Sequence, residues 1–225
     1  MRVEEQLREI GLNRAAEKYR QIAKTAVSNK WSYEKFITAL SEEEIKWRRE
    51  RKQRLFFNLA RFPVIKTFEG FDFSFNLSIE KKAIEELRKM SFIRRCENVI
   101  LLGPPGVGKT HIAIALGVEA IKQGYQVYFT TVDEIVRKIK TTKEDNFLKK
   151  LRKYIHPHLL IIDEMGYTPL DREEANLLFQ VVNMRYEKGS LIITSNKPIV
   201  QWRESIWEMK FWGLQCLIDF CIILM

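Results

Sequence analysis

The clearest chemical signal in the chain is the stretch 103–110, Gly-Pro-Pro-Gly-Val-Gly-Lys-Thr. It follows the apolar run 98–102 and opens a segment with helical spacing of apolar residues. Glycines let backbone N–H groups turn inward around phosphate oxygens, and a helix beginning at Lys109 adds its positive dipole end. We expect Lys109 to reach the β- and γ-phosphates and the Thr110 hydroxyl to ligate Mg²⁺. The pattern predicts a P-loop for ATP and Mg²⁺, with these nucleotide contacts: Gly103, Pro104, Pro105, Gly106, Val107, Gly108, Lys109, Thr110 and His111.

Three polar residues downstream are candidates for the remaining chemistry. Asp163 and Glu164 end the apolar stretch 158–162. Because the carboxyl ends of parallel strands share one edge of a sheet, Asp163 is expected beside the P-loop, where it would hold Mg²⁺. Glu164 would polarise the attacking water, and Asn196, at the end of the next strand, would reach the γ-phosphate or that water. With Lys109 they form the predicted catalytic set; without a P-loop, such residues are ordinary strand ends.

The elements that must position these residues alternate in type from residue 98 onward. We expect four strands at 98–102, 126–131, 158–164 and 190–196. We expect helices from Lys109 to a C-cap at Gly124, near 133–140 and 144–154, and from a capping box at Asp171 to about Glu187. This alternation predicts an α/β fold, a parallel sheet covered on both faces.

The chain before this core is expected to be helical and basic. We divide the sequence into four segments: an N-terminal helical domain (1–66), a linker and packing helix (67–97), the P-loop core (98–202) and a tail (203–225). Pro63 should end the long N-terminal helix. Residues 66–73 should form an extended segment clamped onto the core, followed by an amphipathic helix at 79–90.

Composition limits the partners and the compartment. The 225 residues carry a net charge of +9, which suggests a polyanionic partner. The three cysteines show no metal-ligand spacing, as expected for reduced thiols of the cytoplasm. We see no signal peptide, and the apolar run 211–225 is too short to span a bilayer, so no membrane association is expected.

The strongest local charge lies in the N-terminal helix, with aromatic residues between the cations. We name five candidate contacts to double-stranded DNA: Arg48, Arg49, Arg51, Lys52 and Arg54. Cations neutralise phosphates, and an interleaved aromatic ring can stack on a base. The alternative is a solvated helix face with the aromatic residues on its core side.

Taken together, the segments 103–110, 159–169, 171–176 and 192–198 resemble IstB, the ATPase helper of insertion-sequence transposases. That family is similar to the DnaC helicase loader within the AAA+ class, and the resemblance spans roughly residues 5–202. It implies a Walker B role for Asp163 and Glu164 and a sensor 1 role for Asn196. It also implies non-specific DNA binding, a homo-oligomer on DNA, and a transposase as partner. Alternatives are a loader whose partner is a replicative helicase, and a DNA-binding adaptor that does not hydrolyse ATP.

After Trp202 the sequence departs from that family. The family continues with a Gly-Glu-hydrophobic stretch and a helix containing Leu-Asp-Arg-Leu-Leu-His-His, whereas residues 203–225 are rich in Trp, Cys, Met and Phe. Codons permitted for residues 206–225 allow the family continuation when read from their third base. We therefore hypothesise a frameshift between about residues 202 and 206.

This hypothesis bears on activity. In the related ATPases an Arg of the missing helix contacts nucleotide across a subunit interface, and the tail offers no equivalent. We expect nucleotide binding to persist and oligomer-stimulated ATP hydrolysis to be largely lost. Gene sequencing tests the frameshift: nucleotides at these codons that exclude Asp-Glu-Val-Leu in the neighbouring frame would contradict it.

Overall fold

The computed structural model describes residues 2–74, 80–140, 147–167, 169–199, 201–202 and 221–224. The chain divides into two compact units, residues 1–55 and 56–225. No helix among the described residues is both long and apolar enough to cross a membrane.

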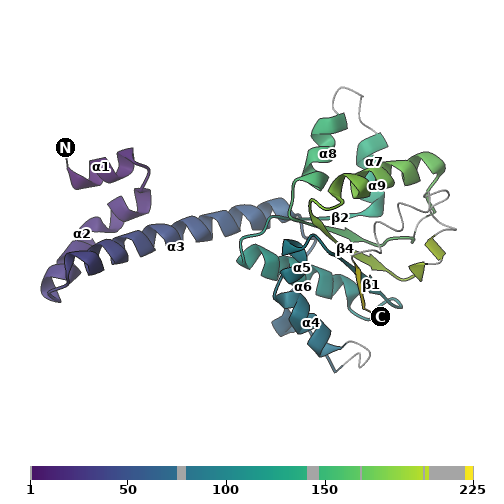
Figure 1. Ribbon diagram of the computed structural model, residues 1–225, viewed down its shortest axis with the longest axis horizontal. Coiled ribbons are helices and arrows are strands. Elements are labelled where there is room, and N and C mark those ends of the chain that lie inside the picture. Colours follow the sequence, from purple (N-terminus) through teal and green to yellow (C-terminus); the bar gives the residue numbers. More distant parts are fainter. Residues whose placement is uncertain are drawn as a thin grey trace. The chain divides into compact units, whose positions relative to one another are not determined.

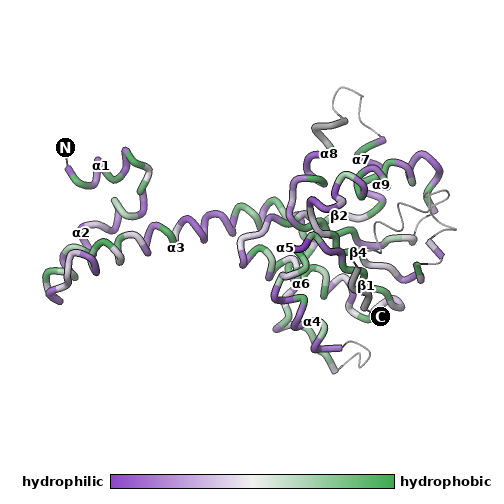
Figure 2. The backbone as a smooth tube through the Cα atoms, in the orientation of Figure 1, coloured by the Kyte–Doolittle hydropathy of each residue, from purple (hydrophilic) through white to green (hydrophobic). Residues whose placement is uncertain are grey.

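In the N-terminal unit, every regular element that the structure describes is an α-helix, as the sequence predicts. It contains α1 (Val3–Glu9), α2 (Asn13–Ser28) and most of α3 (Tyr33–Ala60). Tyr19 of α2 meets Phe36 of α3 edge to face, with ring centroids 6.1 Å apart. In Figure 2, α3 alternates between hydrophilic and hydrophobic colours along its length.

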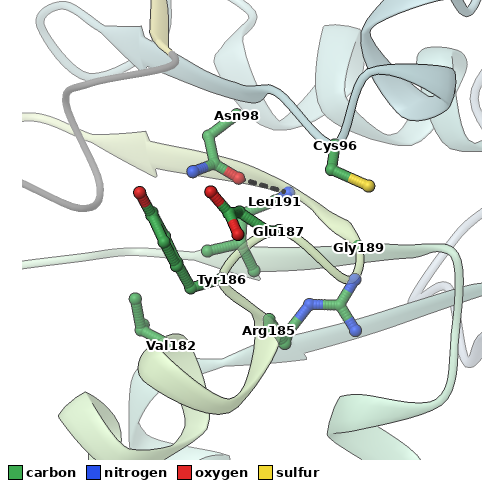
Figure 3. Close-up of a pocket in the computed structure, with 8 residues that line it drawn as sticks. All are labelled: Cys96, Asn98, Val182, Arg185, Tyr186, Glu187, Gly189 and Leu191. Atoms are coloured by element: carbon green, nitrogen blue, oxygen red, sulfur yellow. Dashed lines mark hydrogen bonds between the residues drawn. The ribbon is translucent and has the colours of Figure 1, made fainter.

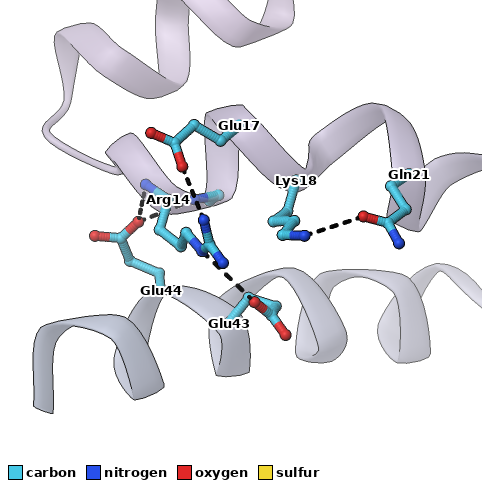
Figure 4. Close-up of polar contacts among 7 residues, drawn as sticks. Arg14, Glu17, Lys18, Gln21, Glu43 and Glu44 are labelled. Carbon is cyan, nitrogen blue, oxygen red and sulfur yellow. Dashed lines mark hydrogen bonds and ion pairs between the residues drawn. The ribbon is translucent and has the colours of Figure 1, made fainter. Parts of the chain in front are cut away.

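A buried carboxylate joins α3 to the start of α2 (Figure 4). Glu44 is 3% exposed, and its Oε2 accepts the backbone N–H groups of Arg14 (2.8 Å) and Ala15 (3.0 Å). These belong to the first turn of α2, where N–H groups have no partner within the helix. The Arg48 guanidinium donates to the other oxygen at 2.7 Å. Burial raises the pKa of Glu44, but the Ala15 N–H, Arg48 and the Arg14 N–H outweigh it, so the pKa lies below its usual value.

The second unit is built on a parallel sheet. Its strands are β1 (Asn98–Leu102), β2 (Val127–Thr131), β3 (Leu159–Asp163), β4 (Ser190–Ser195) and β5 (Cys221–Leu224). The order across the sheet is β2-β3-β4-β1-β5, and every pairing is parallel. The α/β fold class and its four predicted strands are confirmed. β5 lies in the tail, where we assigned no strand.

Helices cover both faces of this sheet (Figure 1). On one face, α4 (Lys81–Arg88), α5 (Ser91–Arg94) and α6 (Lys109–Lys122) bury one set of strand residues, including Ile161 and Ile192. On the other, α7 (Val132–Lys140), α8 (Phe147–Ile155) and α9 (Arg172–Arg185) bury the alternate set, including Ile162 and Ile193. Two-sided burial explains why these strands are apolar throughout rather than alternating.

Several element ends differ from the predictions. The helix expected at 79–90 ends at Arg88, and a separate turn, α5, begins after Met90, whose φ is +55°; Ile79 lies outside the described residues. β3 stops at Asp163, because Glu164 adopts φ +64°. The capping box at Asp171 is confirmed: its carboxylate accepts the Glu174 N–H at 2.8 Å, and the Glu174 carboxylate accepts the Asp171 N–H at 2.9 Å.

A buried arginine ties together the amino ends of two strands. Figure 3 shows the side chain of this residue, Arg185, beside Gly189. The Arg185 guanidinium is 1% exposed and donates to five carbonyl oxygens at 2.7–3.3 Å, those of Tyr154, Ile155, Pro157, His158 and Ser190. These carbonyls end α8 and begin β3 and β4, so the cation also opposes the negative end of the α8 dipole. Burial lowers the pKa of Arg185 to about 10. Among the described residues, Arg185 Nε has no hydrogen-bond partner. Arg185 also lines a cavity of about 10 Å³, which has room for one water at most.

The Glu44 contacts generate a prediction for the N-terminal unit. Glu44→Gln should destabilise α2 by on the order of 1 kcal/mol, the difference between charged and neutral hydrogen bonds. Because the pKa of Glu44 is lowered by folding, its stabilisation is present above the usual value of 4.5 and is lost as pH falls through the lower folded value. Amide exchange of residues 14–20 across pH measures this.

The matched control is Glu43→Gln. Glu43 lies beside Glu44 but is 40% exposed, and its carboxylate is 3.8 Å from Arg14 Nε. We expect it to leave the exchange rates nearly unchanged. Equal effects of the two variants, or a Glu44→Gln effect that grows as pH falls below 4.5, would contradict the assignment.

Candidate nucleotide-binding site

The predicted P-loop connects β1 to the amino end of α6. Gly106 and Gly108 adopt φ +84° and +93°, which only glycine reaches easily. The Lys109 ammonium donates to the carbonyls of Gly103 and Pro104, both at 2.8 Å. Burial lowers the pKa of Lys109, and the Asp163 carboxylate opposes that shift. The loop therefore presents a cation held by neutral carbonyls, beside a helix N-terminus.

The segment 67–73 packs against this loop. A Cβ placed on Gly108 would lie 2.6 Å from Cε2 of Phe71, so the ring is in close contact with the P-loop backbone. Phe71 also meets His111 edge to face at 5.0 Å, and His111 Nε2 lies 2.8 Å from the Thr67 carbonyl oxygen. The predicted extended segment thus includes one 3-10 turn, η1 (Phe68–Gly70), with Phe68 buried. The ring of His111, a predicted nucleotide contact, is engaged with this segment.

Two hydroxyl groups converge on the carboxylate that ends β3. Thr110 Oγ1 lies 2.9 and 3.1 Å from the two carboxylate oxygens of Asp163. Thr194 Oγ1, from β4, donates to Asp163 Oδ1. The structure therefore brings together Thr110 and Asp163, the two residues predicted to hold the metal.

The two other predicted catalytic residues lie at the same edge of the sheet with exposed side chains. Glu164 directly follows Asp163, and its N–H donates to Thr194 Oγ1 at 3.1 Å. Asn196 directly follows Ser195, whose carbonyl accepts the Gly103 N–H at 3.2 Å. Asn196 thus emerges beside the start of the P-loop. In the part of the chain that the structure describes, neither the Glu164 nor the Asn196 side chain is hydrogen-bonded to Asp163 or to the two threonine hydroxyls that contact it.

A second layer of contacts holds the loops after β3 and β4. Ser195 Oγ lies 2.7 Å from the carbonyl oxygen of Met165, and the indole N–H of Trp202 donates to Ser195 Oγ at 3.0 Å. Trp202 is 1% exposed. A Cβ on Gly166 would lie 3.3 Å from Cδ1 of that indole. The backbone that follows Glu164 is therefore packed against buried side chains.

The chemistry of the donor groups fits a magnesium nucleotide. A hydroxyl and a carboxylate are the oxygen ligands that Mg²⁺ prefers, and Mg²⁺ takes its other ligands from phosphates and water. In the described part of the chain, no group of three or more His, Cys, Asp or Glu side chains is arranged so that it could hold a metal ion by itself. Thr110 and Asp163 could bind the cation, and Lys109 could bind the phosphates.

The five basic residues predicted to contact DNA are all exposed on α3. Helical spacing of three and four places Arg48, Arg51 and Lys52 on one side, while Arg49 and Arg54 lie on others. The Arg48 guanidinium bonds to Glu44 and to the Gly11 carbonyl at 2.8 Å, so it also has a structural role. The Arg51 guanidinium lies 5.4 Å from the centroid of the Trp47 ring.

With this geometry established, comparison with known proteins decides the family. The model of the IstB-like ATP binding protein family matches residues 5–212. The chain belongs to this family. The match ends at residue 212 rather than at residue 202, the limit expected from sequence.

Two relatives are insertion-sequence proteins. The IS21 putative ATP-binding protein of Pseudomonas aeruginosa is 43% identical over 180 residues, which cover 80% of this chain and 68% of that protein. The IS5376 putative ATP-binding protein of Geobacillus stearothermophilus is 41% identical over 206 residues, which cover 91% and 82%. Among solved structures, the DnaC helicase loader aligns with a TM-score of 0.53 and 21% identity, over 66% of this chain and 90% of that one. The IstB-like chain thus shares the fold of that loader, a parallel sheet with a P-loop.

Sequence reasoning missed Thr194, Ser195, Trp202 and the contact of Phe71 with Gly108. Two hydroxyl residues directly before Asn196, after the apolar run 191–193, are a signal that could have indicated the first two. Trp202 and Phe71 carry no comparable signal, because aromatic residues at such positions are usually core residues.

The contact between Phe71 and Gly108 predicts the cost of adding a methyl group to this loop. Gly108→Ala should destabilise the nucleotide-free protein by about 1–2 kcal/mol for its left-handed backbone, plus about 1–3 kcal/mol for overpacking against Phe71. Gly124→Ala is the matched control, since Gly124 has φ +90° but nothing within 4 Å of the added carbon. Chemical denaturation measures both. Equal losses of stability would show that the ring moves away without cost.

Proposed function

We propose that this IstB-like protein binds ATP with Mg²⁺ at the P-loop and, in that state, binds double-stranded DNA as a helper of an insertion-sequence transposase. The arrangement that supports this most directly is the convergence of Lys109, Thr110 and Asp163 at one edge of the sheet. Lys109 would bind phosphate oxygens, while Thr110 and Asp163 would hold Mg²⁺. When bound, the cation supplies charge neutralisation at the phosphates.

Roles for the other residues follow from their positions. Glu164 would orient and polarise a water, and Asn196, beside the first residue of the P-loop, would contact the γ-phosphate or that water. The backbone N–H groups of residues 106–110, together with the adjoining His111, would surround the phosphates, and Gly103, Pro104 and Pro105 would shape the start of the loop. Hydrolysis would then act as the switch that releases DNA.

DNA binding rests on the charge of α3 and on the net charge of +9. Arg51 and Lys52 lie on one exposed side of the helix with Arg48, and Arg49 and Arg54 extend the cationic surface around it. We propose that ATP favours a homo-oligomer in which several such helices contact one duplex. ATP and DNA are both available in the cytoplasm, the compartment expected from the cysteines.

A helicase-loading function is the second candidate. The DnaC fold similarity favours it, but at 21% identity that similarity concerns the fold alone. Identities of 43% and 41% to insertion-sequence proteins favour the transposase partner. Co-purification with an insertion-sequence transposase, against co-purification with a replicative helicase, distinguishes the two.

Nucleotide binding is tested with the Lys109→Ala variant and a fluorescent ATP analogue. Loss of a charge-assisted contact of about 1.5–3 kcal/mol should weaken binding by about 10- to 150-fold. Lys122→Ala, at the far end of the same helix and ion-paired to Glu119, should bind as the unmodified chain does. Unchanged affinity of the Lys109→Ala variant would overturn the proposed site.

DNA binding is measured in the same series with and without the analogue. Glu164→Gln separates a hydrolytic switch from a purely structural nucleotide: it should prolong the ATP-dependent DNA complex if hydrolysis drives release. If the unmodified chain releases phosphate from ATP, an unchanged lifetime would favour an adaptor whose DNA release does not use hydrolysis; if it releases none, the expected loss of hydrolysis through the altered tail accounts for the result.

A further inference from the structure

The side chain of Thr194 touches both acidic residues of the site. Its Oγ1 donates to Asp163 Oδ1 and lies 3.1 Å from the backbone nitrogen of Glu164. Thr194 is 2% exposed. Its carbonyl oxygen, in addition, accepts the N–H of Met165 at 2.9 Å. One buried residue of β4 therefore holds three consecutive residues at the end of β3.

The register of the sheet explains this placement. Ile162 of β3 pairs with Ile193 of β4, so Asp163 and Thr194 follow directly on neighbouring strands. In a parallel sheet such neighbours project to the same face. That face is the one covered by α6, which supplies Thr110.

The direction of each hydrogen bond is fixed by chemistry. A backbone N–H can only donate, so Thr194 Oγ1 must accept from Glu164. A hydroxyl carries one proton, and an ionised carboxylate only accepts, so that proton is directed to Asp163. The Thr194 hydroxyl thus links two groups by hydrogen bonds: the Asp163 carboxylate, which would hold the metal, and the backbone of Glu164, which would act on water.

The backbone of Glu164 is in a conformation that needs such support. Its φ of +64° lies in the left-handed region, which residues with a side chain rarely adopt. The N–H bond to Thr194 Oγ1 and the Met165 N–H bond to the Thr194 carbonyl hold the two sides of this turn. Together they set the direction in which the Glu164 side chain leaves the sheet.

We infer that Thr194 is a positioning residue that couples the metal-binding carboxylate of Asp163 to the orientation of Glu164. The inference rests on the proposed nucleotide site for its functional meaning, but the hydrogen bonds of Thr194 do not depend on that proposal. A residue of the same shape without the hydroxyl should break the coupling while leaving the sheet intact. A shorter residue that keeps the hydroxyl should preserve it.

Amide exchange of the nucleotide-free protein, resolved by residue, tests the geometry. In Thr194→Val, the Glu164 amide should exchange about tenfold faster or more, as expected for a hydrogen bond lost within a folded protein. The Met165 amide should stay within about twofold, because its acceptor is the backbone carbonyl of residue 194. In Thr194→Ser, both amides should behave as in the unmodified chain.

Ser190→Ala is the control for a buried hydroxyl on the same strand. Ser190 lies at the opposite end of β4, and its hydroxyl donates to the Phe92 carbonyl at 3.1 Å. It should leave the Glu164 amide unchanged. Equal exchange of Glu164 in the Thr194→Val variant and the unmodified chain would overturn the inference, as would parallel acceleration of Glu164 and Met165, which marks a general loosening of the strand.

The functional arm compares ATP-analogue affinity in Mg²⁺ with that in EDTA. The ratio of the two affinities should fall about tenfold in Thr194→Val and stay within about twofold in Thr194→Ser, since only the first leaves Asp163 without its buried donor. A ratio in the Thr194→Val variant equal to that of the unmodified chain overturns the coupling. If the unmodified chain fails to bind the analogue at all, the proposed function fails instead, and the exchange result alone decides the geometric part of the inference.

Discussion

The Asp163 carboxylate is the point on which the site depends. It receives hydroxyl protons from α6 and from β4, and it lies at the carboxyl edge of a sheet whose strands all run in one direction. A buried charge in this setting is stable only if its hydrogen-bonding capacity is met. Thr110 and Thr194 both donate to it, and these bonds tie the first turn of α6 to β3 and β4.

Other contacts in the core also hold the P-loop at the carboxyl edge of the sheet. α6 is buried along most of its length against the sheet, so the position of its first residues is set by packing rather than by the loop. The close contact of Phe71 with Gly108 adds a constraint from the opposite side of the loop. The loop of the candidate site is therefore held at both ends. Pre-organisation of this kind lowers the ordering cost of binding.

The sequence alone predicted those parts of the candidate site that lie within one continuous motif or that follow from the direction of the strands. The P-loop is one uninterrupted motif, and the proximity of Asp163 to Thr110 follows from the shared edge of parallel strands. The role of Thr194 could not be assigned, because a hydroxyl in a strand has several common partners and only the register selects Asp163. The left-handed turn at Glu164 was missed for a related reason: it is imposed by hydrogen bonds from a neighbouring strand. β5 was missed because an apolar run in an atypical tail carries no periodic signal.

At the amino edge of the sheet, the Arg185 guanidinium lies directly against Gly189. The guanidinium fills the space that any side chain on residue 189 would need, since an added Cβ would lie 2.6 Å from Nη2. Loss of the arginine alone would leave five carbonyl groups without this hydrogen-bond donor. A larger residue at position 189 alone would collide with the Arg185 guanidinium. We therefore expect a substitution at either position to be tolerated better when the other position changes with it.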